Sequence, residues 1–324
     1  MHILVTGGAG YIGSHVVRAL LQAGHSVVVL DDLSTGHREL LAGLHGVTLV
    51  EGDLGNPNLL AQAFDLFPVA AVVHIAGKAL VSQSMSDPAS YYRVNTTAGL
   101  ELLDAMRDRG VRRIVFSSTC AVYGTPDERP VTEGARKKPE SPYGDSKWAF
   151  ETALQAYRAY GLQPIALRYF NVAGACADGS AGELHIPETH LIPNLLLANP
   201  NRPFHLFGTD YDTRDGTCER DFLHVEDLSR AHLLALEYEG DPGTFGGALN
   251  LGLGHGVTVR EILVAAEEIL GREIPTLEAP RRPGDVSSIY ADCSLAQAQL
   301  GWKPQLDLAS MIRSAHDFYT GRPG

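Results

Sequence analysis

The residues with the clearest chemical potential are a tyrosine and a lysine four positions apart, Tyr143 and Lys147. They stand at the expected start of a helix, where residues i and i+4 share one face. An isolated phenol titrates near pH ~10, so Tyr143 can serve as a base at neutral pH only beside positive charge, which Lys147 could supply. Such a pair also arises by chance on many helices, so it predicts proton transfer only in combination with other features.

A run of hydroxyl side chains, Ser117, Ser118 and Thr119, ends a predicted strand upstream of this pair. Ligands of open parallel sheets bind at the carboxyl ends of the strands. Thr119 is therefore a candidate to hydrogen-bond a reacting oxygen. The alternative is that its hydroxyl only caps the next turn.

Three glycines occupy the junction between the first predicted strand and the first predicted helix. Gly7 would allow a tight turn, Gly10 would let the backbone approach a pyrophosphate, and Gly13 would let helix and strand pack closely. The amides that begin the helix would then hold the phosphates. A glycine motif alone is a weak signal, but its position between strand and helix is the context that a dinucleotide site requires.

A carboxylate follows the second predicted strand at the distance from the glycines that such a site predicts. Asp31 can accept hydrogen bonds from the ribose hydroxyls of an adenosine and would repel a 2′-phosphate, so NAD is favoured over NADP. The alternative reading of Asp31 is a loop acid or a helix cap.

The elements that must position these residues alternate between short apolar runs and helical patterns, which is typical of a parallel sheet covered by helices on both faces. We expect strands at His2–Thr6, Ser26–Leu30, Val47–Val50, Ala70–Ile75, Arg113–Ser117 and Pro164–Arg168. Apolar residues at helical spacing predict helices at Tyr11–Ala23, Leu59–Phe67, Asn95–Arg109 and Ser146–Tyr160. The fold class expected is α/β, with a doubly wound parallel sheet of the Rossmann type.

The second half of the chain is less regular and predicts a smaller, discontinuous α/β lobe. Residues 171–219 are rich in Gly, Pro, Asp and Thr, with one short helical piece at Leu191–Asn199. A helix at Val225–Glu239 and a strand at Ala248–Leu251 could rejoin the sheet, and the tail after residue 254 shows two more helical stretches and a turn-rich segment at Ala279–Gly284. We therefore expect a cofactor lobe of residues 1–168 plus 221–253 and a substrate lobe of residues 169–220 plus 254–324.

Composition limits the class of partner. The 324 residues carry a net charge of −12 and no long basic cluster, which argues against nucleic acid as a partner. No apolar run reaches the ~20 residues that span a bilayer, and no signal peptide is indicated, so we expect a cytoplasmic protein without a membrane partner. The four cysteines are scattered and form no CxxC pair, so we predict neither disulfides nor a metal site.

Several segments carry a family resemblance that covers nearly the whole chain. TGGAGYIGSH, YGDSK and SSTCAVYG resemble the extended short-chain dehydrogenase/reductase family. LDDLSTGHR, EGDL, RYFNVAGA, GTDYDTRDGTCERDFLHVEDL and APRRPGD are similar to segments of the sugar-nucleotide 4-epimerases within that family, and these blocks are more specific than the glycines. The resemblance implies a tightly bound NAD that is regenerated in each turnover, a UDP-hexose substrate and a homodimer formed by helices of the cofactor lobe.

The resemblance also assigns residues by position. The catalytic residues would be Tyr143, Lys147 and Thr119. The residues around the cofactor would be Gly7, Gly10, Tyr11, Ile12, Gly13, Asp31, Asp32, Leu33, Ser34, Thr35, Gly36, Asp53, Leu54, Ile75, Ala76, Gly77, Asn95, Ser117, Tyr143, Lys147, Tyr169 and Phe170. The residues around the substrate would be Thr119, Tyr143, Asn171, His190, Leu191, His205, Leu206, Phe207, Arg220, Arg282, Asp285 and Ile289.

Two positions depart from the family pattern. Lys78 follows Gly77 immediately, whereas many relatives place a polar residue slightly later, which puts its contact with the cofactor in doubt. Thr119 stands where serine is frequent, and the hydroxyl is retained.

The expected reaction interconverts UDP-glucose and UDP-galactose through a 4-ketose, with Tyr143 moving the proton. Three alternatives remain open: a 4-epimerase of an N-acetylated, uronic or pentose UDP-sugar, a sugar-nucleotide dehydratase, and a noncatalytic NAD sensor. Cys120 and Ala121 stand where similar dehydratases have an acidic pair, and the retained Tyr143 and Lys147 argue against the sensor. The intermediate bulk of Ile289 weakly favours plain hexoses.

Overall fold

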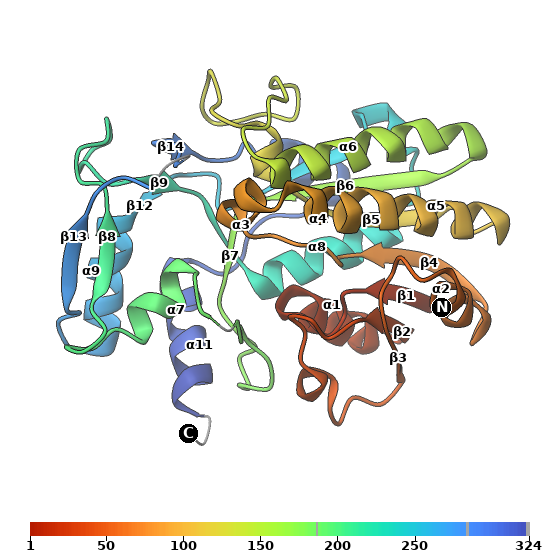
Figure 1. Ribbon diagram of the computed structural model, residues 1–324, viewed down its shortest axis with the longest axis horizontal. Helices are drawn as coiled ribbons and strands as arrows, with labels where there is room; N and C mark the ends of the chain where they lie inside the picture. Colours follow the sequence, from red (N-terminus) through yellow and green to blue (C-terminus); the bar gives the residue numbers. More distant parts are fainter. Residues whose placement is uncertain (186, 283–284, 322–324) are drawn as a thin grey trace.

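A parallel sheet of seven strands organises the larger part of the chain (Figure 1). The computed structural model describes residues 1–185, 187–282 and 285–321. The sheet has the order β11-β6-β5-β4-β1-β2-β3. Its strands are β1 (His2–Thr6), β2 (Ser26–Asp31), β3 (Val47–Glu51), β4 (Val69–His74), β5 (Arg113–Thr119), β6 (Gln163–Tyr169) and β11 (Ala248–Leu251). The chain order reverses between β1 and β4, and this switch point is where ligands of open α/β sheets bind.

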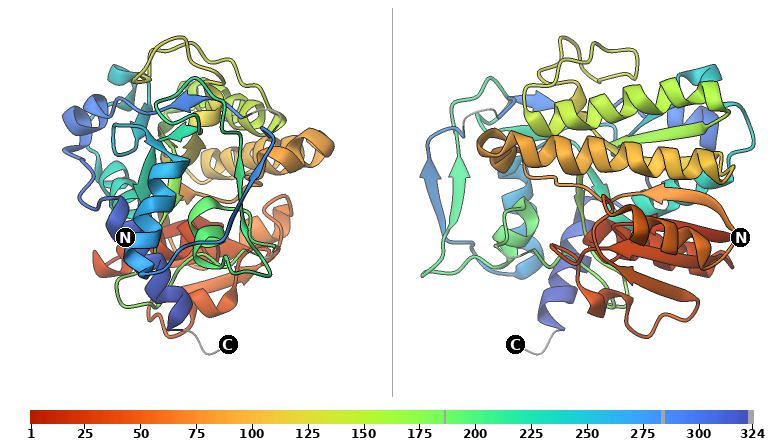
Figure 2. Two further views of the ribbon diagram at one scale, coloured as in Figure 1. Left: turned by 90° about the vertical axis from the view of Figure 1, so that its left-hand side faces the viewer. Right: turned by 45° about the vertical axis from the view of Figure 1, so that its right-hand side comes forward.

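Helices cover both faces of this sheet (Figures 1 and 2). One face carries α1 (Tyr11–Gln22) and α8 (Val225–Glu237). The other carries α2 (Pro57–Asp65), α5 (Ala98–Asp108) and α6 (Pro142–Tyr157). Between β4 and α5 the chain forms α3 (Val81–Ser86), α4 (Pro88–Tyr92) and a π-helical turn at Arg93–Thr97.

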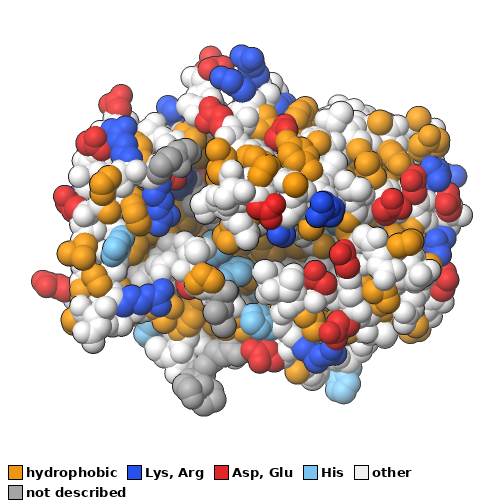
Figure 3. Space-filling model, in the orientation of Figure 1, with side chains coloured by type: hydrophobic (Ala, Val, Ile, Leu, Met, Phe, Trp, Pro, Cys, Tyr) orange, Lys and Arg blue, Asp and Glu red, His pale blue; other side chains and the backbone are white. Residues whose placement is uncertain are grey.

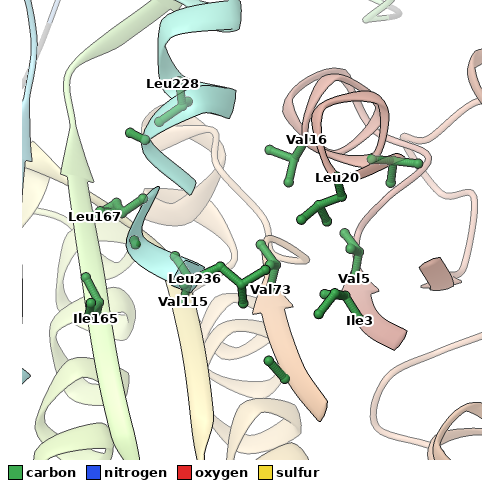
Figure 4. Packing of buried hydrophobic residues seen from close by; sticks show 14 of the residues in the cluster. Ile3, Val5, Val16, Leu20, Val73, Val115, Ile165, Leu167, Leu228 and Leu236 are labelled. Carbon is green, nitrogen blue, oxygen red and sulfur yellow. The ribbon is translucent and has the colours of Figure 1, made fainter. Parts of the chain in front are cut away.

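The continuous apolar runs of the strands follow from this double cover. Ile3 and Val5 of β1 pack in the core beneath α1, whereas Leu4 belongs to the core on the opposite face. All three side chains are fully buried. Figure 4 shows Val16 and Leu20 of α1 directed toward Ile3 and Val5. A strand buried on both faces has no reason to alternate apolar and polar residues.

A second, smaller lobe has its own apolar core. It is formed by α7 (Leu191–Leu196), α9 (Val259–Leu270), α11 (Leu308–Thr320) and β8 (Phe204–Phe207) paired with β13 (Thr276–Ala279). Two further small sheets are present. One has the strand order β12 (Val257–Thr258), β9 (Glu219–Arg220), β14 (Ser288–Ile289). The other pairs β10 (Phe222–His224) with β7 (Asn171–Ala173). We call the part made of β8, β13 and the β12-β9-β14 sheet the outer lobe.

The predicted fold class is confirmed, and each predicted strand of the large sheet is present within two residues of its expected ends. The short strands β7, β8, β9, β10, β12, β13 and β14 and the helices α3 and α4 were not predicted, because pieces of two to six residues carry little periodicity. The prediction of two helices in the tail is wrong: α9, α10 (Ser294–Leu300) and α11 lie there. Of the turn-rich segment at 279–284, Pro283 and Gly284 lie outside the described residues.

The boundary between the two lobes remains a prediction. Helix α10 follows residue 254 in sequence, yet it contacts α8 and β11, and its Ala296 belongs to the core beneath the large sheet. Among the described residues, no helix has the length and apolar character needed to cross a bilayer.

Candidate active site at the carboxyl ends of the parallel strands

The glycine turn after β1 brings two strand ends together. Gly7 has a φ of +73°, a backbone conformation that favours glycine, and its amide donates to the carbonyl of Leu30 at 2.9 Å. A Cβ at this position would lie 2.6 Å from the amide nitrogen of Ala76, which follows β4. The absence of a side chain at Gly7 therefore lets the ends of β1 and β4 meet at the switch point of the sheet.

The first turn of α1 is built to receive an anion. Its N-cap is Gly10, which has no side chain to occupy the helix amides. A Cβ on Gly13 would collide with the carbonyl oxygen of Gly7, so this glycine is required for the helix to approach the turn. The amides of Tyr11 and Ile12, together with the helix dipole, remain available for phosphate oxygens.

Asp31 is held by the backbone on both sides. Its Oδ2 accepts from the amide of Ala9 at 2.8 Å and its Oδ1 from the amide of Leu33 at 2.9 Å. Burial raises the pKa of Asp31, and the two amides oppose that change. A Cβ on Gly36 would lie 2.8 Å from Asp31 Oδ1, so glycine there avoids a clash with the carboxylate.

Further predicted cofactor residues lie in the loops that follow β2 and β3. Asp32 accepts from the amide of Ser34 at 2.9 Å, and Asp53 Oδ1 accepts from the amide of Gly55 at 2.8 Å. Both acids are exposed, as is Thr35, whereas Leu54 is buried. These residues follow β2, which pairs with β1, and β3, which pairs with β2, so they lie on the side of the glycine turn where the adenosine was predicted.

Asn95 fixes the segment after β4. Its Oδ1 accepts from the amide of Lys78 at 2.8 Å, and its Nδ2 donates to the carbonyl of Lys78 and to Ser146 Oγ, each at 3.0 Å. A Cβ on Gly77 would lie 2.9 Å from Asn95 Oδ1 and 3.1 Å from Lys147 Nζ. The Lys78 side chain donates to Ser90 Oγ at 3.1 Å, so its ammonium is directed to α4.

Tyr143 stands in the first turn of α6. Pro142 begins this helix, and Ser141 caps it by accepting from the amide of Gly144 at 3.2 Å. The Tyr143 ring is buried and meets the ring of Tyr91 edge-on, with centroids 6.4 Å apart. Burial raises the pKa of its phenol above the ordinary value, and a hydrogen bond with Thr119 opposes that rise. Loss of its proton near neutral pH therefore requires nearby positive charge.

Lys147 lies one turn further along α6. Its ammonium donates to the carbonyl of Ser117 at 3.0 Å and lies 4.8 Å from the ring centre of Phe116. Burial lowers its pKa to about 8, against the opposing effect of Glu151. Burial is thus the largest influence on both pKa values, raising that of the Tyr143 phenol and lowering that of the Lys147 ammonium.

The hydroxyls at the end of β5 point to different partners. Thr119 Oγ1 accepts from the amide of Ala121 at 3.1 Å and hydrogen-bonds Tyr143, so it both caps a turn and reaches the phenol. Ser117 hydrogen-bonds His232, with Oγ 2.8 Å from Nε2, and also the half-buried Tyr169. Only Thr119 of the three therefore contacts the Tyr143 hydroxyl.

A buried ion pair behind the strand end was missed by sequence reasoning. Glu151 accepts from Arg168 Nε at 3.0 Å and from its Nη2 at 2.6 Å, and Ser118 donates to the same carboxylate. Both charged side chains are nearly inaccessible, at 5% and 4% exposure. The spacing offered a signal, because Tyr143, Lys147 and Glu151 recur every four residues on one helix face.

The outer lobe presents arginines toward the same region. Arg220 lies on β9, and its Nη2 is 3.7 Å from Asp285 Oδ1. The guanidinium of Arg282 stacks on the ring of Phe207, 3.9 Å from its centre. Arg220 also lowers the pKa of Cys120, which follows Thr119, although burial raises that pKa to about 12 overall. The charge of Arg220 in the outer lobe therefore acts on a residue at the end of β5.

The remaining predicted substrate residues fall into two environments. His205, between Phe204 and Leu206 on β8, is exposed, as is Asn171. Ile289 is buried with Phe170 in a small apolar cluster, so it presents bulk where the two lobes meet.

His190 caps the short helix that Leu191 begins. Burial alone would lower its pKa, but hydrogen bonds from Nδ1 to Glu183 and Glu188 raise it to about 10. These two acids were not predicted as partners of His190. Leu191 is half-buried beside it.

Residues from remote parts of the chain thus converge on one region. The glycine turn, the segment after β4, the end of β5 and the start of α6 lie together, and Arg220 of the outer lobe lies close enough to Cys120 to affect its pKa. In the space-filling view the surface is hollowed between the outer lobe and the α3–α6 side, with Lys or Arg side chains on the outer-lobe wall (Figure 3). Such a groove can take a dinucleotide on the sheet side and an anionic substrate on the other.

The sequence and the fold are both similar to characterised proteins. The family model described as "NAD dependent epimerase/dehydratase family" matches residues 3–252. A UDP-glucose 4-epimerase of Lacticaseibacillus casei is 45% identical over 327 residues, covering 100% of this chain and 98% of the relative.

Two solved structures give the same result. A UDP-glucose 4-epimerase from Brucella ovis in complex with NAD is 43% identical, with a TM-score of 0.91 and 98% of each chain covered. A UDP-glucose 4-epimerase from Bifidobacterium longum in complex with NAD+ and UDP is 35% identical, with a TM-score of 0.93 and 100% of this chain and 99% of that chain covered.

Proposed function

This chain belongs to the NAD dependent epimerase/dehydratase family, and on that premise we propose that it interconverts UDP-glucose and UDP-galactose through a 4-keto intermediate. The observation that carries the proposal is the full-length similarity to UDP-glucose 4-epimerases, at 45% identity for the Lacticaseibacillus casei protein. It is supported by the juxtaposition of Tyr143, Thr119 and Lys147 at the strand ends.

The residues present fit NAD. Gly7 and Gly13 have no room for a side chain, and the helix start at Gly10 leaves amides available for a pyrophosphate. Asp31, fixed by two amides, would accept from the adenosine ribose. When bound, NAD supplies a reversible hydride acceptor and, in its oxidised form, a positive charge.

Tyr143 is the proposed proton carrier. Its Oη would take the proton from the sugar 4-hydroxyl as C4 is oxidised, and would return it when C4 is reduced on the other face. A buried phenol with a raised pKa can do this only if cationic charge stabilises the phenolate, and the Lys147 ammonium is the charge that this chain provides. Thr119 would hold the reacting oxygen, since its hydroxyl already reaches that of Tyr143.

The outer lobe is proposed to bind the UDP part of the substrate. Arg220 and Arg282 would pair with the diphosphate, because guanidinium groups match phosphate oxygens in geometry and charge. The 3.7 Å separation of Arg220 from Asp285 leaves that pair loose enough to be exchanged for a ligand. The other residues proposed around UDP are Asn171, His190, Leu191, His205, Leu206 and Phe207.

The proposal also covers which sugar the site prefers. The buried Ile289 next to Phe170 fills space where a sugar 2-substituent would extend, which favours plain hexoses. We also propose a cytoplasmic homodimer joined through the cofactor lobe, since Leu100 and Ala105 of α5 and Ala153 and Tyr157 of α6 are only partly buried. All four cysteines are free, as is usual in a reducing compartment.

The test is a substrate panel of UDP-galactose, UDP-glucose and their N-acetylated and carboxylated analogues, incubated with purified, NAD-loaded protein. We expect UDP-galactose to reach equilibrium with UDP-glucose while absorbance at the NADH band shows no stoichiometric increase. Accumulation of NADH with turnover would identify a dehydrogenase instead. Exclusive conversion of an analogue would overturn the hexose assignment, and a single mass in light scattering equal to one chain would overturn the dimer.

A further inference from the structure

The loop that leads into α7 concentrates metal-binding side chains in eight residues. Glu183, His185, Glu188 and His190 form two Glu-x-His pairs in succession. One ligand atom from each residue can be chosen so that all four lie within 4.8 Å of one another. The short spacing places imidazole and carboxylate donors around one point, as in metal sites built from a short stretch of chain.

The contacts within the cluster converge on one carboxylate. Glu183 Oε1 lies 2.6 Å from Nδ1 of His190 and 2.9 Å from Nδ1 of His185. Glu188 Oε1 lies 3.0 Å from the same His190 nitrogen. The Glu183 side chain is 5% exposed, so its negative charge is removed from water and needs a partner.

The donor set identifies the class of ion. Two carboxylates carry two negative charges, which are balanced either by protons on both imidazoles or by one divalent cation bound to neutral imidazoles. Two nitrogen and two oxygen donors suit Zn²⁺ and similar transition metals better than Ca²⁺ or Mg²⁺, which prefer oxygen alone. We propose that Glu183, His185, Glu188 and His190 bind one divalent transition-metal ion of the zinc class.

Groups outside the cluster hold these ligands in place. The Tyr319 hydroxyl of α11 donates to the carbonyl of Glu183 at 3.0 Å and lies 3.4 Å from Glu188 Oε2. The amides of Thr189 and His190 donate to Glu188 Oε1 at 2.7 and 2.8 Å. Such second contacts orient the ligands of bound metals.

The position of the loop gives the ion a structural role. Nε2 of His37, in the segment after β2, lies 2.8 Å from the carbonyl of Leu184, and Tyr319 reaches the loop from the smaller lobe. An ion bound there would fix the loop between the cofactor side and α11, at the start of α7. The inference goes beyond the proposed function and does not depend on it, but it assigns the His190 imidazole to the ion instead of to UDP.

The test uses untagged, NAD-loaded protein stripped with a chelator and titrated with ZnSO4 alone. After gel filtration, elemental analysis should find one Zn²⁺ per chain, and calorimetry should give a single class of site. His185→Gln should weaken Zn²⁺ binding by at least about 100-fold, since even changes to outer contacts cost 10- to 100-fold. The matched control His45→Gln removes an exposed histidine outside the cluster and should bind as the parent does.

Two further measurements keep the result decisive. Bound NAD and the circular dichroism spectrum report whether His185→Gln is folded, and if it is not, Glu183→Gln takes its place. Co²⁺ added to the parent should give the intense visible absorption of a tetrahedral site, and His185→Cys should add a thiolate charge-transfer band. Substoichiometric Zn²⁺ in the parent, or equal binding by folded parent and cluster variants, would overturn the site whatever the epimerase assay shows.

Discussion

The carboxyl ends of the large sheet and the outer lobe hold their charged groups in different ways. Behind β5, Glu151 and Arg168 share three hydrogen bonds of 2.6 to 3.2 Å at about 5% exposure. In the outer lobe, Arg220 and Asp285 are 3.7 Å apart, with 17% and 35% of their side chains exposed. The sheet side is thus fixed before a ligand arrives, whereas Arg220 in the outer lobe stays free to exchange its partner.

This difference suits the two tasks proposed for the regions. Proton transfer requires Tyr143 to be positioned within tenths of an ångström, which packing and buried hydrogen bonds provide. Binding a diphosphate requires cations that can leave one partner for another, and weakly paired, partly exposed arginines lose little on that exchange. A site that combines both can hold UDP firmly and keep Tyr143 still while the sugar turns to present its other face.

The largest effect should come from removing the proton carrier. Tyr143→Phe keeps the ring and its contact with Tyr91, so the fold and NAD content should persist while kcat falls by about 10²- to 10⁴-fold. Steady-state rates with UDP-galactose measure this. Tyr160→Phe, an exposed tyrosine, is the control and should retain full activity. Parent-level turnover by Tyr143→Phe would break the assignment of the strand ends as the catalytic side.

Glu151→Gln tests whether the sheet side is fixed by its buried pair. Glutamine has the same shape but leaves the Arg168 charge uncompensated, so the free energy of unfolding should fall by about 3–5 kcal/mol. Urea denaturation measures it. The exposed outer-lobe pair Arg281–Asp210 provides the contrast, and Arg281→Gln should leave the urea midpoint nearly unchanged. Equal effects of the two substitutions would remove the distinction between the regions.

Lys147 predicts how the stability of the sheet side depends on pH. Burial lowers its pKa in the folded chain from 10.5 to about 8, so between these pH values the unfolded chain binds more protons and stability rises with pH. Lys147→Met buries no titratable group at this position. Its free energy of unfolding at pH 7 should therefore exceed that of the parent by up to about 3 kcal/mol. The difference should close by about pH 10.5. Urea unfolding of the NAD-free proteins at pH 7 and pH 10 measures this difference in the free energy of unfolding. A difference that is the same at both pH values would contradict the role of Lys147.

The smallest effect belongs to the outer lobe. Arg282→Gln removes one cation from the proposed UDP site, which should raise KM for UDP-galactose by about 10- to 100-fold, corresponding to roughly 1.5–3 kcal/mol for a charged hydrogen bond. The value of kcat should change little, because the reacting groups lie elsewhere. Arg313→Gln, on the exposed side of α11, is the control. A fall in kcat with unchanged KM would place Arg282 in the catalytic step instead.

Much of the cofactor side was predictable because its signals are local. The turn at Gly7, the acid at the end of β2 and the spacing of Tyr143 and Lys147 each depend on residues within a few positions of one another. The outer lobe gave weaker signals, since strands such as β9 and β14 have two residues each and exist only through pairing with distant segments. Its proposed residues came from a family resemblance and not from periodicity.

By itself, the sequence determined the alternation of strands and helices, the glycine turn and the helical spacing of Tyr143 and Lys147, because these depend on neighbouring residues. Only the tertiary structure decided that burial raises the pKa of Tyr143 and lowers that of Lys147, that Glu151 pairs with Arg168, and that two acids meet His190. Burial and long-range contacts arise when remote segments pack together, and no local pattern records which segments these will be.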